Sequence, residues 1–189
     1  MRPFDFVSVF YSVVLGVAVA QLMTGVARLV EQRHRVRTYW VHTVWVIVLL
    51  LTDATNWWSL WDLREAKSWH IGAFLLLIAL TAVIFVMTVL LFPREAHPSE
   101  VIDLRTHYYA NSAVFLRATA AACALSVVCN FIFYPVDTWL DPWLSIPGAI
   151  VLLALVVAPS RKPIYHALLS VATLVGIILM LLMQGTRIQ

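Results

Sequence analysis

Charged residues are scarce in this sequence. Asp, Glu, Lys and Arg together account for 12% of the 189 residues, whereas hydrophobic residues account for 62%. Soluble globular proteins carry about twice that share of charge, so the composition excludes an ordinary soluble domain. The formal net charge is +3, and the basic residues stand in short connections, not on one long patch. This distribution argues against a nucleic-acid-binding protein.

Cysteine and glycine are also rare. The two cysteines, Cys123 and Cys129, stand in one apolar segment. On a helix they would lie roughly 9 Å apart along the axis and point different ways, so they cannot form a disulfide with each other. The six glycines form no GxSxG, P-loop or GxGxxG motif, and no CxxC or Cys/His metal spacing occurs. The sequence therefore gives little support to soluble-type catalysis.

Long apolar runs dominate the rest of the chain. They cover residues 4–30, 39–61, 71–92, 110–134, 143–158 and 164–183. A membrane-spanning helix needs about 20 residues, with a range of about 17–25. Only the run at 143–158, which has Pro147 near its start, is shorter than this range. The first run continues past Ala20 to Val30, and Asp5 stands where a signal peptide has its positively charged n-region, so we expect a retained helix and not a signal peptide. The predicted fold is all-α, a polytopic membrane bundle of six transmembrane helices in one domain covering residues 1–189.

The connections between these runs predict the orientation. The first and fifth carry clusters of basic residues: Arg28, Arg33, Arg35, Arg37, Arg161 and Lys162. The fourth connection has acids but no Lys or Arg. The positive-inside rule then places the first, third and fifth connections in the cytoplasm and both termini outside, in a bacterial-type inner (plasma) membrane. The third connection, residues 93–109, is the longest, and Ser99 within it predicts the start of the fourth helix.

The second run carries a polar stripe. On a helix, His42, Leu49, Asp53 and Asn56 fall within about 60° of one another. A carboxylate near the middle of a spanning helix is costly, so Asp53 marks either a functional group in a pathway or a buried group that is paired or neutral for structural reasons. The stripe should face protein or water and not lipid.

Further polar residues in the apolar runs extend this candidate pathway. The predicted polar core consists of Asp53, Asn56, Gln21, Arg117 and Asn130. Arg117 stands about seven residues into the fourth run, where two interpretations are open. Its long side chain either reaches back to the cytoplasmic interface or pairs with Asp53 across the bundle.

Histidines gather at the predicted cytoplasmic end. His42, His107 and His166 each stand at the start of a spanning helix, and with Asn111 they form a candidate polar cluster. Converging imidazoles are able to bind a metal or haem, or to sense pH. Histidine is also common at membrane interfaces because its ring is amphipathic, and no pair here has the i, i+4 or HExxH spacing. No cofactor is therefore expected, and a haem or metal at these histidines is the alternative.

Small residues recur at intervals of four in the first run: Ser8, Ser12, Gly16, Ala20 and Thr24. Such spacing lets helix backbones approach closely in lipid. We predict a packing seam here, with Gly16 facing another helix of the chain or of a neighbouring subunit.

Two short motifs open the second and fourth runs: Tyr39-Trp40-Val41-His42 and His107-Tyr108-Tyr109-Ala110-Asn111. In these motifs, and over most of its length, the chain resembles small bacterial six-span membrane proteins that have no assigned activity. A looser resemblance is to bacterial relatives of the lysosomal potassium channel, which also have six spans and carry Phe-Ser followed closely by Asp in the first helix. The corresponding stretch here, residues 10–16, lacks the acid, so that family's filter is not carried over.

These observations favour a small channel or transporter for ions or protons, with a polar pathway around Asp53. Its expected partners are membrane lipids, an ion or small solute, and further copies of itself in a homo-oligomer; no nucleic acid is expected. One alternative is a redox or lipid-acting protein that uses the cytoplasmic-side histidines at the membrane interface. The other is a structural or sensory membrane subunit without catalytic turnover.

Overall fold

The computed structural model describes residues 3–65, 70–93, 101–133 and 142–185, and within these ranges the chain folds into six α-helices. The helices are α1 (Pro3–Glu31), α2 (Trp40–Asp62), α3 (Ile71–Leu91), α4 (Leu104–Phe133), α5 (Pro142–Val157) and α6 (Pro163–Gly185). Two 3-10 turns, η1 (Arg33–Arg35) and η2 (Leu63–Glu65), and two short strands, β1 (Val36–Arg37) and β2 (Ile102–Asp103), complete the elements. The all-α prediction is confirmed.

Four of the helices are long and apolar enough to cross a membrane. They are α1, α3, α4 and α6. Helix α2 has 23 residues and is long enough, but it does not reach the same apolarity because polar residues such as His42, Asp53 and Asn56 interrupt it. Helix α5 has 16 residues, with Pro147 inside it. Six spans therefore remain a prediction, whereas several membrane-type helices are a property of the fold.

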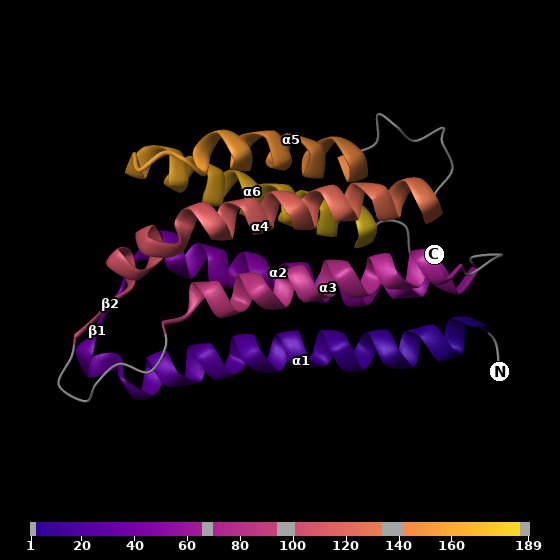
Figure 1. The fold of residues 1–189 in the computed structure, drawn as a ribbon, viewed down its shortest axis with the longest axis horizontal. Coiled ribbons are helices and arrows are strands. Elements are labelled where there is room, and N and C mark those ends of the chain that lie inside the picture. Colours follow the sequence, from indigo (N-terminus) through magenta and orange to yellow (C-terminus); the bar gives the residue numbers. More distant parts are fainter. Residues whose placement is uncertain (1–2, 66–69, 94–100, 134–141, 186–189) are drawn as a thin grey trace.

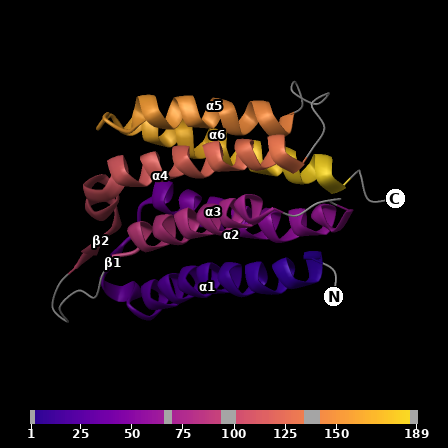
Figure 2. The same ribbon diagram turned by 45° about the vertical axis from the view of Figure 1, so that its right-hand side comes forward.

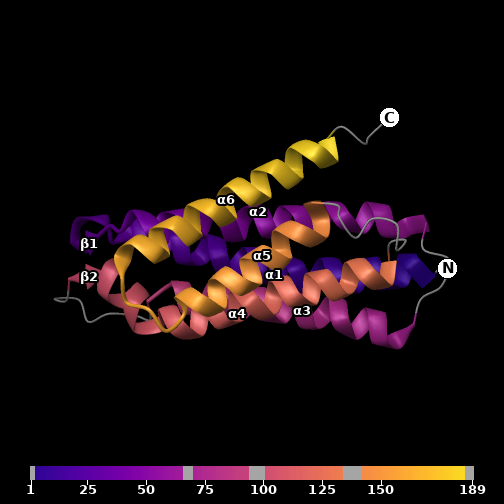
Figure 3. The same cartoon turned by 90° about the horizontal axis from the view of Figure 1, so that it is seen from above.

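The helices lie side by side in layers (Figures 1 and 2). Helix α1 forms one outer layer, α2 and α3 form the middle, and α4, α5 and α6 form the opposite side. Figure 3 shows that α6 runs obliquely to the long helices. The largest side chains in the core come from several layers and include Tyr11, Trp45, Ile84, Phe115 and Leu169. Helix α1 begins and α6 ends at the same end of the bundle (Figure 1).

The opposite end is tied together by the two short strands, and we call it the β-bridge end. Strands β1 and β2 pair in parallel, with Val36 opposite Ile102 and Arg37 opposite Asp103. This pairing joins the α1–α2 connection to the residues that lead into α4. The basic residues of η1 and β1 stand at this end, as do Arg161 and Lys162 between α5 and α6.

The start of α4 differs from the prediction. The helix begins at Leu104 and not near Ser99, which lies outside the described residues. The side chain of Asp103 accepts hydrogen bonds from the backbone N–H groups of Arg105 (2.9 Å) and Thr106 (3.3 Å) and from the Thr106 hydroxyl (3.1 Å). These bonds lower the pKa of the Asp103 carboxyl below its ordinary value. Asp103 thus caps the helix, because its own pairing with β1 keeps the preceding backbone extended.

The packing seam predicted on α1 is wrong as a contact within the chain. A Cβ added at Gly16 would meet no atom within 4 Å, whereas one added at Gly25 would lie 2.5 Å from the Phe92 ring. The buried face of α1 consists of Val7, Tyr11, Leu15, Ala18, Leu22 and Gly25. Val7, Tyr11, Leu15 and Leu22 have larger apolar side chains than the residues of the predicted seam, so burying them removes more apolar surface from solvent. The small-residue face then points outward, and Gly16, Ala20 and Thr24 are exposed.

Candidate functional site

Asp53 lies in the middle of the bundle and is almost completely buried. It stands roughly 20 Å along α2 from Trp40, and its residue exposure is 1%. Within the described part of the chain, neither carboxyl oxygen has a hydrogen-bond partner. Buried polar groups are nearly always hydrogen-bonded, so an unsatisfied carboxyl is an exception that calls for an explanation.

Two hydroxyl groups lie on the neighbouring helices that cover Asp53. The Tyr11 side chain on α1 contacts Thr81 on α3, and it lies close enough to Asp53 for an electrostatic interaction between the two side chains. Both residues are buried, and the Thr81 hydroxyl also donates to the Leu77 carbonyl at 3.0 Å. The sequence reasoning missed Tyr11 and Thr81. The only signal for them was a hydroxyl on an inward-facing position, which is common in membrane helices.

Arg117 does not pair with Asp53. Its neighbours Phe115 and Leu116 are 1% and 0% exposed, while Arg117 itself lies on the exposed side of α4. Asp53 points toward α1 and α3 and has no hydrogen-bond partner. The hypothesis of an ion pair across the bundle is therefore wrong, and the other interpretation, a side chain at the bundle surface, fits the position of Arg117.

Of the remaining residues of the predicted polar core, Asn56 lines a cavity between α2 and the α3–α6 helices, and Asp53 is not among the residues that line this cavity. Gln21 on α1 and Asn130 on α4 are each half-buried. A continuous pathway through all five residues thus stays a prediction.

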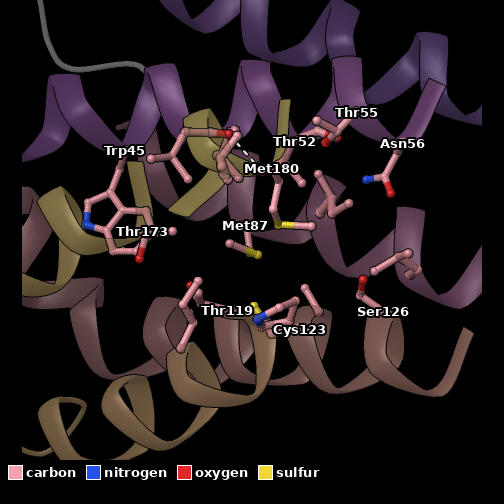
Figure 4. Close-up of a pocket in the computed structure, with 18 residues that line it drawn as sticks. Trp45, Thr52, Thr55, Asn56, Met87, Thr119, Cys123, Ser126, Thr173 and Met180 are labelled. Carbon is pink, nitrogen blue, oxygen red and sulfur yellow. Dashed lines mark hydrogen bonds between the residues drawn. The ribbon is translucent and has the colours of Figure 1, made fainter. Parts of the chain in front are cut away.

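The cavity that contains Asn56 has a volume of about 110 Å³. It lies between α2, α3, α4, α5 and α6, and Figure 4 shows Trp45 at one end and Asn56 with Ser126 at the other. Most of its lining is apolar. Several lining threonines use their hydroxyls within their own helices, as Thr52 does by donating to Val48 at 2.8 Å and Thr119 to Phe115 at 3.0 Å.

A second group of buried polar residues connects α2, α4 and α6 near the β-bridge end. The Trp45 indole N–H donates to the Tyr108 hydroxyl at 3.2 Å, and that hydroxyl lies 3.0 Å from His166 Nδ1. His166 Nε2 lies 2.7 Å from the Ser160 carbonyl, which only accepts. Nε2 must therefore carry the proton, so in the neutral ring Nδ1 accepts from Tyr108. Every polar atom in this chain of contacts has a partner.

Two further histidines bind the end of α3. His42 Nε2 donates to the Leu91 carbonyl at 3.0 Å, and His107 Nε2 donates to the Leu90 carbonyl at 3.1 Å. The last carbonyls of a helix have no partner within the helix, and these imidazoles supply one. The Asn111 side chain donates to the carbonyl of His107 in its own helix at 3.1 Å.

The aromatic residues around these histidines complete the cluster. The hydroxyls of Tyr39 and Tyr109 lie 3.1 Å apart, and the Tyr109 ring contacts His166 with centroids 5.1 Å apart.

The predicted cluster of His42, His107, Asn111 and His166 is thus assembled at one end of the bundle, but each histidine binds a different backbone carbonyl. No group of three or more His, Cys, Asp or Glu side chains in the described ranges is placed to hold a metal ion. His34 is exposed on η1, and His97 lies outside the described residues. Trp45, whose indole N–H binds the Tyr108 hydroxyl, was not predicted as a member.

Comparison of the chain with protein-family models, curated proteins and solved structures finds no match. The resemblance to small six-span bacterial proteins stays a prediction. The site that requires an explanation is Asp53, because it is the one carboxyl among the described residues whose oxygens are both buried without a hydrogen-bond partner.

Proposed function

We propose that this chain is an integral membrane protein that carries protons or small monovalent cations, with Asp53 as the group that binds them. The single observation behind this proposal is that both carboxyl oxygens of Asp53 are buried without a partner. An ionised carboxylate in that position has lost its hydration without forming a hydrogen bond or ion pair in the protein, which costs free energy. Binding a proton or a cation neutralises the charge and removes this cost.

The surroundings of Asp53 suit such a role. The hydroxyls of Tyr11 and Thr81 on the covering helices offer oxygen atoms that a proton or a monovalent cation is able to use. Arg105 and Arg117, the two arginines of α4, are both exposed, so no fixed counter-charge from that helix competes with the bound species. A covered site of this kind carries ions only if the bundle opens in turn toward each side of the membrane. Helix α1 covers Asp53 from the outer layer, so its displacement is the simplest opening.

The orientation is part of the proposal. We place all six helices across a bacterial-type inner membrane, with the β-bridge end in the cytoplasm and both termini outside. The basic residues of η1, β1 and the α5–α6 connection at one end support this orientation under the positive-inside rule. The outward position of Gly16 and its neighbours leaves a face of small residues through which copies of the chain are able to pack as a homo-oligomer.

Flux through liposomes tests this proposal. Purified protein is reconstituted into vesicles with a trapped pH-sensitive dye, and proton, sodium and potassium gradients are imposed in turn. We expect the wild type to dissipate at least one gradient and the Asp53→Asn variant to be at least about tenfold slower, since the amide neither releases a proton nor balances a cation.

The matched control is Asp5→Asn, which makes the same chemical change at an exposed position on α1 and should leave the flux unchanged. Wild-type vesicles no leakier than empty ones, or equal flux in Asp53→Asn, would overturn the proposal.

A further inference from the structure

Arg117 is an exposed arginine far along an apolar helix. It stands on the outer face of α4, which packs on α3 and α5 with its other sides (Figure 1). Within the described ranges it forms no hydrogen bond or ion pair. Arg105, the other charged residue of α4, stands in the first turn of the helix. A charge inside a membrane-type helix is costly unless another group pairs with it, so Arg117 calls for a partner.

The histidine contacts at the β-bridge end fix the depth of Arg117. His107 binds the Leu90 carbonyl, so this point of α4 is level with the end of α3. Helix α3 has 21 residues, and its length of roughly 32 Å matches the hydrocarbon core of a bilayer, which is about 30 Å thick. Arg117 follows His107 by ten residues, or roughly 15 Å. With α3 across the membrane, the backbone of Arg117 therefore lies near the middle of the core.

The Arg117 side chain is too short to leave the core. Side chains of a helix lean toward its N-terminus, which for α4 is at the β-bridge end. An extended arginine reaches roughly 7 Å from its Cα atom, about half of the distance to the interface. The guanidinium group thus ends within the hydrocarbon, short of the phosphate groups of the lipids.

A second copy of the chain offers no carboxylate for Arg117. Of the 10 acidic residues in the sequence, Asp53 alone stands near the middle of an apolar run. Asp53 lies at a similar depth, since it follows His42, which binds the Leu91 carbonyl, by eleven residues. Its carboxyl is buried inside the bundle, so it does not reach the outer surface of another copy. The carboxylate that pairs with Arg117 then has to come from a different protein.

The surface around Arg117 suits a helix. Exposed residues recur along α4 at intervals of three and four: Ala110, Val114, Arg117, Ala121, Ala124 and Val128. Residues at these intervals form one continuous stripe on a helix, and we call it the Arg117 stripe. Ala121 and Ala124 are small, so a second helix is able to approach the backbone of α4 closely beside the guanidinium.

We propose that the Arg117 stripe binds a membrane-spanning helix of another protein, and that this helix carries an aspartate or glutamate near its middle that pairs with Arg117. A guanidinium and a carboxylate form two parallel charge-assisted hydrogen bonds, and in hydrocarbon no water competes for them. The depth of Arg117 selects helices whose acid stands at the same level. This inference rests on the membrane placement proposed above, but it does not depend on ion transport by Asp53.

A synthetic helix tests the inference. The full-length protein carries a donor dye and is reconstituted into phosphatidylcholine vesicles with a leucine-rich peptide of about 21 residues, long enough to span the bilayer. The peptide carries an acceptor dye and a single Asp at its centre. We expect saturable energy transfer, and about tenfold weaker binding when the Asp is replaced by Leu or moved to one end of the peptide.

Variants of the protein show whether the contact is direct. Arg117→Gln should bind the Asp peptide about tenfold more weakly, and Arg117→Glu should bind a peptide with a central Lys instead. Arg105→Gln is the matched control, because it makes the same change at the other exposed arginine of α4; its affinity should equal that of the wild type. A photo-crosslinking residue in place of Ala121 should label the peptide, whereas one in place of the exposed Ala172 on α6 should not.

Equal binding of the Asp and Leu peptides, or equal affinity of Arg117→Gln and the wild type, would overturn the inference. So would energy transfer between two labelled copies that Arg117→Gln abolishes, since a second copy would then cover the stripe. Displacement of the Asp peptide by added anionic phospholipid would assign Arg117 to the lipid surface instead. Asp53→Asn should bind the peptide normally, so a loss of flux leaves this result intact. Protein that does not float with the vesicles would overturn both proposals.

Discussion

The two buried polar regions of this bundle are built in opposite ways. At the β-bridge end, Trp45, Tyr108 and His166 form an unbroken series of hydrogen bonds, and His42 and His107 bind the free carbonyls of α3. In the middle, Asp53 is equally buried and has no hydrogen-bond partner among the described residues.

This difference separates stability from function. A satisfied polar network fixes the helices that it joins, whereas an unsatisfied group costs stability and persists where it serves another purpose. In the sequence the histidines were candidate ligands for a metal or haem, but in the structure their Nε2 atoms form hydrogen bonds with backbone carbonyls. The Asp53 carboxyl has no such partner among the described residues, which is why we propose it as the group that binds an ion.

The largest expected effect is at the network. Tyr108→Phe removes the hydroxyl between Trp45 and His166 and leaves an indole N–H and an imidazole nitrogen buried without a partner. The free energy of unfolding in detergent should fall by about 2–4 kcal/mol. Tyr165→Phe removes an exposed hydroxyl on α6 and should change it by less than about 0.5 kcal/mol. Equal effects of the two variants would mean that the network adds nothing to stability.

A second variant near the same end tests the close approach of α1. Gly25→Ala places a methyl group against the Phe92 ring, which itself packs on His42 with ring centroids 5.7 Å apart. The crowding should cost about 1–3 kcal/mol of unfolding free energy. Gly16→Ala, on the open face of the same helix, should be close to neutral. A larger loss at Gly16 in detergent-solubilised oligomer would show that this face is covered by a second copy.

The opposite sign is expected in the middle of the bundle. Asp53→Leu removes an unsatisfied polar group at a buried site, so the free energy of unfolding should rise by about 1–2 kcal/mol while ion flux is lost. The same gain is expected in an Arg117→Gln background, because the two residues do not pair. Destabilisation by Asp53→Leu would show that the carboxyl has a partner in the native state and would remove the contrast between the two regions.

The smallest effect concerns the cap of α4. Asp103→Ala should lower the melting temperature slightly at pH 7. Because hydrogen bonds lower the pKa of Asp103 in the folded state, its stabilisation is present above the unfolded pKa and is lost as pH falls through the folded value. Melting curves of both proteins from pH 7 to about pH 3 should therefore converge on acidification. A constant difference would assign the effect to something other than the ionised carboxylate.

Hydrophobic run length predicted the helices well. The expected run at residues 71–92 corresponds to α3 at Ile71–Leu91, and that at 39–61 to α2 at Trp40–Asp62. The start of α4 was missed because the β1–β2 pairing joins segments far apart in the sequence, and no local pattern indicates a two-residue strand pair. The cap at Asp103 follows from that pairing.

Side-chain direction was the harder part of the site. The spacing of Asp53 with His42 correctly placed both on a buried face of α2, because helical period alone decides this. The direction of Arg117 depends on which face of α4 meets α3 and α5, and the sequence does not specify it. The direction of the small residues of α1 could not be predicted either, since their spacing is compatible with facing lipid, another helix of the chain or another subunit.

The series of hydrogen bonds from Trp45 through Tyr108 to His166 also has a consequence for biosynthesis. Because synthesis proceeds from the N-terminus, α2 and α4 are made before α6. Until then, the Tyr108 hydroxyl, which accepts from Trp45, lacks its acceptor, Nδ1 of His166 on α6. A chain that stops before α6 retains a buried hydroxyl without its imidazole. A product that lacks α6 should therefore be less stable than one that contains it.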